Sequence, residues 1–456
     1  MNTRSVLDWL SNISDIDHQP CKRPDAPSRK RRRPLTPDST NDNNDSMPTS
    51  DDDASHPHKR HNAADDMTPR PTRKRIQTVR SESDYSLASP SRDSSASQRS
   101  GSQSPRKQFH VLRLQADGII YRDLPQFTNK PTGLRSLLDS IDDGMDGNGI
   151  IPSSQQPSLV KAARDYDEFR WAARGNYYFS DNRDAVGQTP SVEDVLRILD
   201  NSVECSAGQH HEDGWNKFVH APLLELAFHP RGERVKDQLV SFTSCVHASI
   251  ISDYGTRSTA KKVDFCIYIN PSNDRTPSSA PTVPAIKRLI HQLPRKAFNP
   301  TDFVPLEERP IALSIETKRP AEGFDGAKLQ LGVWQMAHWS FLRHLMDMQS
   351  SSESARSQEL EQEPSLAEGE GSGRRLQYPE FLPGIIIQGH NWHLVITTFN
   401  GSQTTFWQKV PIGSTDDTKG IYKLVHSLQV LRNWVDKSYW PWLRGLILQG
   451  DTAHNS

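Results

Sequence analysis

The sequence has few cysteines, few apolar residues and no long hydrophobic run. Its four cysteines among 456 residues form no CxxC pair, which argues against a disulfide framework and a structural zinc site. The longest apolar stretches, such as residues 385–387 and 394–396, are far shorter than the ~20 residues of a membrane helix. The polar N-terminus does not resemble a signal peptide. We therefore expect an intracellular protein without a membrane span.

The apolar content also limits how much of the chain can be core. Only 34% of the residues are hydrophobic and 32 are proline, which favours one domain of good size together with disordered segments. The net charge of -1 hides an asymmetry. Residues 1–108 contain 19 Lys/Arg and 15 Asp/Glu, a charge of +4, whereas the rest contains 36 and 41, a charge of -5. Any contact with a polyanion is therefore expected from local clusters.

Residues 1–108 have the composition of a disordered tail with basic clusters. Ser, Pro, Asp, Asn and Arg dominate residues 14–107, so this segment cannot bury enough apolar surface to offset the entropy of ordering. A short amphipathic helix is expected at residues 6–13. The basic runs at 29–33 and 73–75 favour contact with the nuclear import machinery and residence in the nucleus, with plain solvation as the alternative.

Residues 109–446 have the pattern of a mixed α/β domain. A β-hairpin is expected around Asp117-Gly118 because apolar runs flank this pair. Ser, Glu and no periodicity predict a disordered insertion at 349–375, and residues 447–456 are expected to be a flexible C-terminus. Helices are expected at 134–141, 159–173, 192–199, 212–228, 326–348 and 419–438, and strands at 235–251, 263–269, 311–318, 385–388, 392–399 and 404–409.

Two predicted strands carry the residues most informative for chemistry. In the strand 311–318, Glu316 and Lys318 share one face, so two opposite charges emerge side by side at the strand end. The strand 263–269 carries one acid, Asp264, in an otherwise apolar and aromatic run, where an unpaired carboxylate is costly. An ordinary ion pair at a sheet edge is the alternative for Glu316 and Lys318.

If these two strands are neighbours, their acids form a site for a hard divalent cation. Asp264 and Glu316 would supply carboxylate ligands for Mg²⁺, or for Mn²⁺, with the carbonyl of Thr317 and waters completing the shell. Lys318 would then orient the attacking hydroxide or offset charge on a phosphate. The pattern thus favours hydrolysis of phosphodiester bonds.

An acid on one strand, Glu-x-Lys on the next and a helix with glutamine after it resemble the PD-(D/E)XK nuclease superfamily. The resemblance covers residues 109–446 and is closest to a fungal family of nuclease-like proteins. It implies a restriction-endonuclease-like mixed sheet flanked by helices. The phrases that carry it are Trp215-Asn216 with Val219-His220, Ile315 to Arg319, Gln330 to Trp334, and Leu382-Pro-Gly384 leading to Gln388 to Trp392.

The resemblance assigns roles at matching positions. Asp264 matches the acid of the second motif, Glu316 and Lys318 match the third motif, and Gln330 matches the glutamine of the following helix, with Gln335 as a weaker rival. The helical acid of the first motif matches Glu212 best, and Glu225 competes for this role. A Pro-Asp pair often stands directly before Glu-x-Lys in the superfamily, whereas here Asp264 lies about fifty residues upstream.

The expected function is that of a metal-dependent nuclease, with DNA as the favoured substrate. Lys328, Arg319 and Lys262 lie near the site in the sequence and are candidates for phosphate contacts. The alternative is a nuclease-fold module that binds nucleic acid or protein without cutting, because fold does not imply function. The sequence leaves open DNA or RNA, endo or exo cleavage, and the oligomeric state.

Overall fold

A computed structural model describes residues 104–255, 261–320, 322–360 and 377–449, without the side chains of 352–360. The predicted disordered tail, its short helix and its basic clusters at 29–33 and 73–75 fall outside these residues. So does most of the predicted flexible C-terminus.

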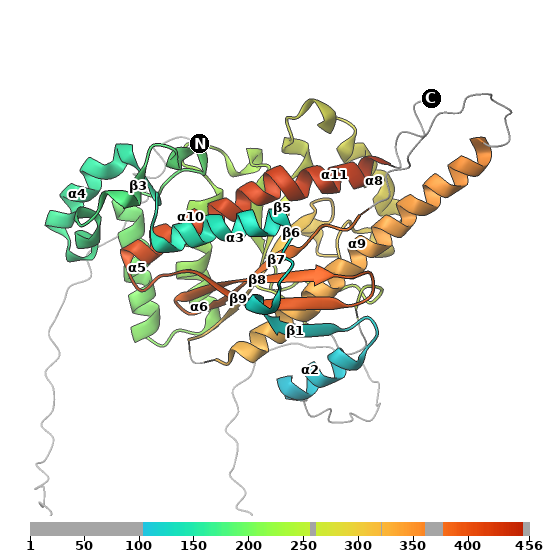
Figure 1. Ribbon diagram of the computed structural model, residues 1–456, viewed down its shortest axis with the longest axis horizontal. Coiled ribbons are helices and arrows are strands. Elements are labelled where there is room, and N and C mark those ends of the chain that lie inside the picture. Colours follow the sequence, from blue (N-terminus) through green and yellow to red (C-terminus); the bar gives the residue numbers. More distant parts are fainter. Residues whose placement is uncertain (1–103, 256–260, 321, 361–376, 450–456) are drawn as a thin grey trace, which may run out of the picture. The chain divides into compact units, whose positions relative to one another are not determined.

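Within the described residues, seven strands form one mixed sheet in the order β1-β9-β8-β7-β6-β5-β4 (Figure 1). The pairs β1–β9 and β6–β7 are parallel, and the other pairs are antiparallel. The mixed α/β sheet expected from the sequence is therefore confirmed. The strands are β1 (Ile119–Asp123), β4 (Val240–Ser244), β5 (Phe265–Ile269), β6 (Ile311–Lys318), β7 (Leu382–Gln388), β8 (Asn391–Phe399) and β9 (Thr404–Ser414).

The sheet separates two hydrophobic cores. On β7, Ile385 and Ile387 belong to one core and Ile386 to the other, as alternation along a strand requires. The smaller core lies under α2 (Pro105–Leu114) and the first half of α9 (Phe324–Leu360). The larger core lies under helices that include α3 (Thr132–Asp146), α5 (Val192–Ala207), α7 (Ala221–Phe228), α10 (Thr418–Trp434) and α11 (Trp440–Gln449).

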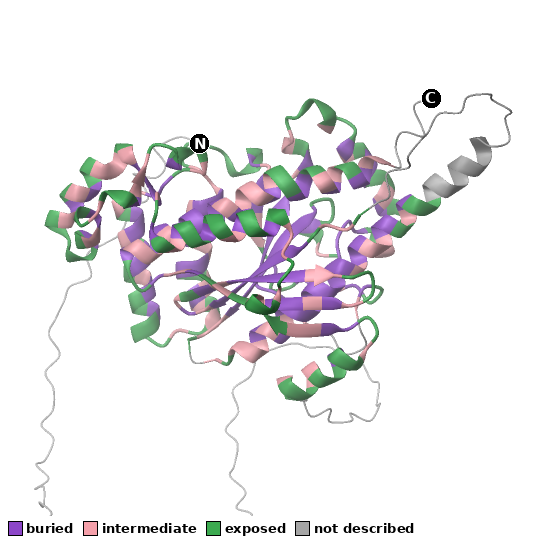
Figure 2. Cartoon of the chain, in the orientation of Figure 1, coloured by how far each residue is buried: buried purple, intermediate pink, exposed green. Residues whose placement is uncertain are grey.

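Both faces of the sheet are therefore covered, and the central strands are buried along most of their length (Figure 2). Helices α3 and α10 pack together on the side of the larger core (Figure 1). A charged side chain on a central strand consequently lies in a low-dielectric interior unless it stands at the strand's end, where the loops meet solvent.

Most predicted elements form close to the expected positions because their signals are local. Helix α5 begins after Ser191, whose side chain accepts a hydrogen bond from the backbone N–H of Asp194 and forms a capping box with it. On α9, Trp334, Ala337, Phe341 and Leu345 are buried and recur at the spacing of one helical face.

The predicted hairpin around Asp117-Gly118 is wrong. Residues 105–114 form the helix α2, and the strand that follows, β1, pairs in parallel with β9 rather than with a neighbour in sequence. The apolar residues before Asp117 serve a helical face instead: Leu112 is buried against the sheet and Phe109 is half-buried. A partner strand about 285 residues later leaves no trace in a local pattern.

Three other boundaries differ from the sequence-based expectation. Helix α9 extends to Leu360, so the first part of the predicted insertion at 349–375 is helical, and residues 361–376 lie outside the described part. The predicted helix 159–173 breaks at Tyr166 into α4 (Gln156–Asp165) and a 3₁₀ segment. The long strand expected at 235–251 contains a 3₁₀ turn at its start, and only Val240–Ser244 joins the sheet.

Among the described residues, Cys205, Cys245 and Cys266 are buried and free of disulfides. No helix in the described ranges combines the length and the apolar character needed to cross a bilayer.

Candidate active site

The acids predicted on two strands come together where β5 begins and β6 ends. These strands are antiparallel neighbours, and the backbone N–H of Asp264, just before β5, donates to the carbonyl of Ile315 at 3.0 Å. The carboxylate of Asp264 then accepts from the backbone N–H of Thr317 at 2.8 Å. Asp264 and Glu316 are only 7% and 1% exposed. Two carboxylates about fifty residues apart in the chain are thus buried at one end of the sheet.

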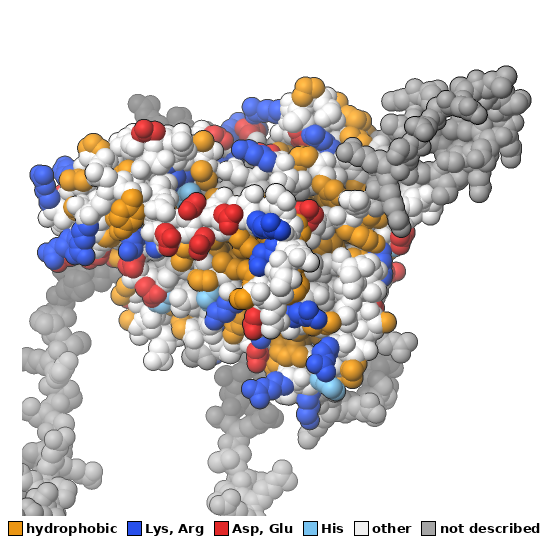
Figure 3. Space-filling view, in the orientation of Figure 1, with side chains coloured by type: hydrophobic (Ala, Val, Ile, Leu, Met, Phe, Trp, Pro, Cys, Tyr) orange, Lys and Arg blue, Asp and Glu red, His pale blue; other side chains and the backbone are white. Residues whose placement is uncertain are grey.

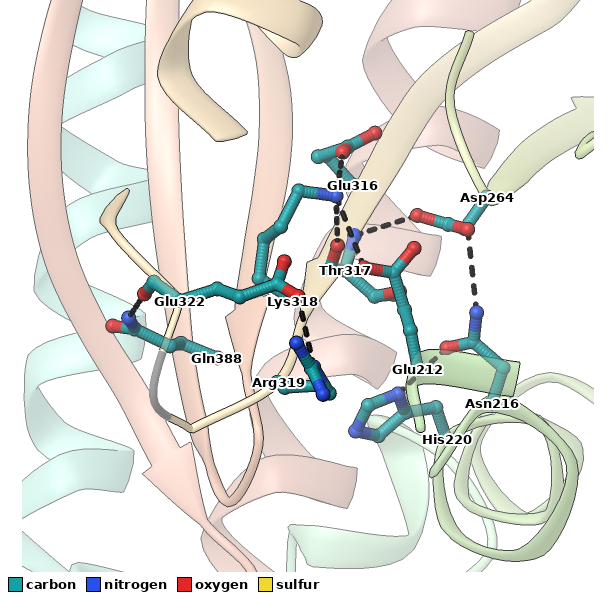
Figure 4. Close-up of polar contacts among 10 residues, drawn as sticks. All are labelled: Glu212, Asn216, His220, Asp264, Glu316, Thr317, Lys318, Arg319, Glu322 and Gln388. Atoms are coloured by element: carbon teal, nitrogen blue, oxygen red, sulfur yellow. Dashed lines mark hydrogen bonds and ion pairs between the residues drawn. The ribbon is translucent and has the colours of Figure 1, made fainter. Parts of the chain in front are cut away.

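The ammonium group of Lys318 is surrounded by three oxygen atoms (Figure 4). It donates to Oε1 of Glu316 at 2.6 Å, to the carbonyl of Thr317 at 2.7 Å and to Oε2 of Glu212 at 3.1 Å. Glu212 comes from the opposite direction, on the first turn of α6 (Glu212–Trp215). Its side chain is 32% exposed, whereas that of Glu316 is 1% exposed, so Glu212 forms the solvent side of the cluster.

Three carboxylates lie near one ammonium group, and two of them, Glu316 and Glu212, contact it; the three repel one another. Burial, and after it the charge of Asp264, raises the pKa of Glu316 well above its usual value and also raises the pKa of Glu212. Burial likewise raises the pKa of Asp264, although the N–H of Thr317 opposes this. Burial acts to lower the pKa of Lys318, but Glu316 and Glu212 outweigh it and leave that pKa raised. The cluster therefore carries excess negative charge around one cation.

Asn216 and His220 support Asp264, and the sequence analysis gave neither a role. The amide Nδ2 of Asn216 donates to Oδ1 of Asp264 at 3.3 Å, and Oδ1 of Asn216 lies 2.9 Å from Nδ1 of His220. Nε2 of His220 lies 3.1 Å from the carbonyl oxygen of Gly389, in the turn between β7 and β8. A chain of polar contacts thus connects the acid to the next hairpin. The signals in the sequence were the four-residue spacing of Asn216 and His220 and their place in the phrases that carry the family resemblance.

The ring of His220 is enclosed by tryptophans. It stacks on Trp215 with centroids 5.8 Å apart and meets Trp392 edge-on at 5.6 Å. Burial lowers the pKa of His220 to about 4, so the ring is neutral at pH 7. A neutral ring carries one N–H, which can donate to Asn216 or to Gly389 but not to both. His220 is therefore a fixed structural contact rather than a charge carrier.

A π-helix at Asn216–His220 sets the direction of Asn216 and His220. It joins α6 to α7 within the helical segment 212–228 expected from the sequence. Pro222 follows in the first turn of α7, where its ring would clash with the carbonyl four residues earlier in a regular helix. A second π-helix, Val435–Tyr439, also stands just before a proline, Pro441. Such widened turns are frequent at functional sites.

The rim of the site is held by short contacts near the end of β6. Arg319 pairs with Glu322 at 2.8 Å, and the side chain of Gln388 donates to the carbonyl of Glu322 (Figure 4). Gly389 turns the chain with φ of +56°, and a Cβ there would collide with the ring of Pro320. Glycine is required at this turn because both the backbone conformation and the space exclude a side chain.

The remaining predicted site residues lie apart from the acid cluster. Gln330 is half-buried on α9, and the described residues offer its side chain no hydrogen-bond partner. Its rival Gln335 is buried and bonds Pro383 and Thr397, which is a structural role. Glu225, the competitor of Glu212, is exposed on α7.

The predicted phosphate-contacting residues are also dispersed. Arg319 lies at the rim, paired with Glu322. Lys262 is exposed just before Asp264. Lys328 is 14% exposed, pairs with Asp325 at 2.8 Å and lies against aromatic rings of the smaller core.

The donor chemistry of the cluster suits a hard divalent cation. Carboxylate oxygens of Asp264, Glu316 and Glu212 and the carbonyl of Thr317 are the ligand types that Mg²⁺ and Mn²⁺ prefer. Three of these groups already contact a cation, the ammonium of Lys318. Within the ranges described, no three His, Cys, Asp or Glu side chains are grouped closely enough to hold a metal by themselves. Waters and the Thr317 carbonyl would have to complete a shell.

Comparison with known proteins gives one match. The family model described as PD-(D/E)XK nuclease superfamily matches residues 160–440, more than half of the chain. No curated protein and no solved structure matches. The matched range contains the strands β5 and β6, the helix segment with Glu212 and the turn at Gly389, which are the parts that build the acid cluster. The chain belongs to the PD-(D/E)XK nuclease superfamily.

Proposed function

We propose that the protein is a metal-dependent nuclease that hydrolyses phosphodiester bonds of nucleic acid, with DNA as the favoured substrate. The observation that carries the proposal is the ammonium of Lys318 held by Glu316, Glu212 and Thr317 beside the buried carboxylate of Asp264. A lysine serving only as a structural counter-ion would need one carboxylate. Here acidic groups outnumber the cation, which leaves capacity for a second positive charge.

Each residue of the cluster then has a definite task. Asp264, fixed by the N–H of Thr317 and by Asn216, and Glu316 would hold a divalent cation, with the carbonyl of Thr317. When bound, such a cation supplies positive charge at the scissile phosphate and lowers the pKa of water. Lys318 places a further positive charge at the end of β6, where it offsets charge that develops on the phosphate.

Glu212 is suited to accept and donate a proton or to hold a water molecule. Its carboxylate is the most exposed of the three, and its pKa is raised by burial and by Asp264. A carboxyl group with a raised pKa takes up and releases protons closer to neutral pH than an ordinary glutamate does. Gln330 is proposed to act in support, by contact with nucleic acid on the α9 side.

Cleavage assays on the purified full chain test this proposal. Single-stranded, duplex and branched DNA and RNA would be incubated with Mg²⁺ or Mn²⁺ and with EDTA. We expect cleavage only with metal, its loss in Asp264→Asn and Lys318→Ala, and its decrease in Glu212→Gln. Glu225→Gln is the matched control, because this glutamate is exposed on the same helical segment. Activity unchanged in both Asp264→Asn and Lys318→Ala would exclude this site as its source.

Metal uptake is measured separately by calorimetry. Wild-type protein should take up Mn²⁺ in a process that Asp264→Asn abolishes. Metal uptake and DNA binding without cleavage of any substrate would instead favour a nuclease-fold module that binds without cutting.

A further inference from the structure

The helix α2 and the strand β1 form an edge of the domain that precedes the matched family range. They span residues 105–123, whereas the match begins at residue 160. Among the residues that the structure describes, strand β1 is the last strand on its side of the sheet and pairs only with β9. Helix α2 packs on α9 and on β1. The residues of the acid cluster come from other elements, so the acid cluster does not account for the charges on this edge.

The charged side chains of α2 are all basic, and they stand beside two exposed apolar residues, Val111 and Leu114. The helix carries Arg106, Lys107, His110 and Arg113, all exposed, and has no Asp or Glu. Arg106, His110 and Arg113 follow one another at spacings of four and three, so they lie along one side of the helix. No ion pair with an acidic side chain is found for these residues within the described chain. In Figure 3, Lys and Arg side chains gather over α2 and β1.

One strand beside α2 extends this surface. Arg122 on β1 is exposed, but it lies over the ring of Trp407, 6.0 Å from its centroid, and so stands on the sheet face of the larger core, opposite α2. Lys409 is exposed at a β-bulge, where Val395 pairs with Gln408 and Leu394 with Val410. Its ammonium lies 4.9 Å from the ring of Phe324, and in the part of the chain described here no carboxylate pairs with it. Bulges commonly redirect a side chain in this way.

Aromatic side chains link the basic edge to the active site. Lys328 stands 5.4 Å from the ring of Phe109 on α2 and 5.9 Å from that of Phe324. Phe324 begins α9, two residues after Glu322, which binds Arg319 at the rim of the site. The loop that follows Lys318 therefore leads directly to the residues that hold α2 in place.

The charges on this edge indicate a binding surface for a polyanion rather than an ordinary solvated surface. Solvated faces generally mix both signs, and residues 109–456 together are negative. This edge exposes Arg106, Lys107, Arg113 and Lys409 beside two exposed acids, Asp117 between α2 and β1 and Asp123 at the end of β1, so its net charge is positive. Exposed arginines and lysines are the usual partners of phosphate groups, and such contacts position a nucleic acid without reading its sequence.

We infer that α2, with Lys409, binds the phosphodiester backbone of the nucleic acid substrate and leads it toward the acid cluster. The identity of this occupant rests on the proposed nuclease function. The binding is sequence-independent, because the contacts offered are charges aimed at phosphates rather than donors and acceptors shaped for base edges.

The test compares two charge-reversal variants of the full chain. Arg106→Glu/Arg113→Glu changes α2, and Lys161→Glu/Arg164→Glu is the matched control on α4, where both residues are exposed and α4 lies at the other end of the domain (Figure 1). Binding of labelled duplex DNA, single-stranded DNA and an RNA hairpin would be measured by fluorescence anisotropy in EDTA, over a range of salt concentrations.

We expect the α2 variant to bind at least about tenfold more weakly than wild type, and its salt dependence to fall by about two in the slope of log K against log salt. The control should stay within about twofold. Equal losses in both variants, no loss in the α2 variant, or no binding by wild type to any of the three probes would overturn the inference. Binding through α2 without cleavage in Mg²⁺ would retain it and remove the proposed nuclease function instead.

Discussion

The acid cluster and the α2 edge use charge in opposite ways. In the cluster, Glu316 and Asp264 are almost fully buried, and Glu316 and Glu212 share the ammonium of Lys318, so each charge depends on its neighbours. On the α2 edge, Arg106 and Arg113 are exposed and act independently of the core. Buried groups are strongly coupled because the surrounding dielectric is low, whereas water and salt screen exposed ones. Substitutions in the cluster should therefore alter chemistry and stability together, and those on the edge should alter binding alone.

The largest expected effect is the loss of cleavage activity in the Lys318→Ala variant. Removing a charge aimed at the phosphate is expected to lower kcat by about 10²- to 10³-fold. Exposed Lys161 offers the control, since Lys161→Ala removes a lysine far from the cluster. Steady-state kinetics on duplex DNA in Mg²⁺ measure the effect. A fall in kcat shared by both variants would show that the cluster is not distinct from the rest of the surface.

A smaller effect is expected when Asn216 is replaced by alanine. Asp264 then loses one of its two hydrogen-bond donors, and such losses around a metal ligand typically cost about 10- to 100-fold in metal affinity or activity. The readout is the Mn²⁺ concentration at half-maximal cleavage, together with calorimetric uptake. Asn433→Ala is the control, because Asn433 is an asparagine that donates to the backbone carbonyl of Val186, outside the elements that build the site. An unchanged metal requirement in Asn216→Ala would refute the positioning role.

The raised pKa of Glu316 predicts how stability changes with pH. The native state binds a proton at Glu316 more tightly than the unfolded chain does. The contribution of Glu316 to stability is therefore highest below the ordinary pKa of 4.5 and is lost as pH rises through the raised pKa of the native state. Glu316→Gln removes this loss of stability at high pH, because glutamine stays neutral. In EDTA we expect its Tm to exceed that of wild type by ~2–4 °C at pH 8 for each kcal/mol recovered.

The difference in Tm between Glu316→Gln and wild type should close below pH 4.5, where Glu316 is protonated in both states. Thermal melts between pH 4 and pH 8 test this, with Glu225→Gln as an exposed control. A variant less stable than wild type at pH 8 would mean that the ion pair with Lys318 outweighs the cost of burying the charge.

The smallest expected effect is on the stability of the α2 variant. Because Arg106 and Arg113 are exposed, Arg106→Glu/Arg113→Glu should change the free energy of unfolding by no more than about 0.5 kcal/mol. Urea denaturation followed by circular dichroism measures this. A larger loss would indicate that α2 depends on its charges for docking, and the contrast between the two regions would then fail.

Local patterns in the sequence were sufficient for the third-motif residues. Glu316 and Lys318 two apart on one strand necessarily share a face, and the strand 311–318 forms with the predicted bounds. The cost of burying Asp264 alone also indicated a site, since such a carboxylate needs partners. These inferences hold because alternation and desolvation are properties of a few adjacent residues.

Other parts of the site depended on contacts between distant segments. The sequence alone left Glu212 and Glu225 as competitors, and only the packing of α6 against the end of β6 places Glu212 on Lys318. The contact of His220 with the carbonyl of Gly389 joins residues 169 apart. Neither contact can be read from periodicity, because periodicity describes neighbouring residues and both contacts join segments far apart in the chain.

By itself the sequence determined the fold class, the family and the acid–lysine pair on β6, because alternation, capping and burial act over a few neighbouring residues. Tertiary structure alone decided which helical acid joins the pair, how Asn216 holds Asp264, and that residues 105–114 become a basic helix beside β1 instead of a hairpin. The reason is physical. Strand pairing and the coupling of charges depend on distances in space, and the separation of two residues along the chain does not determine these distances.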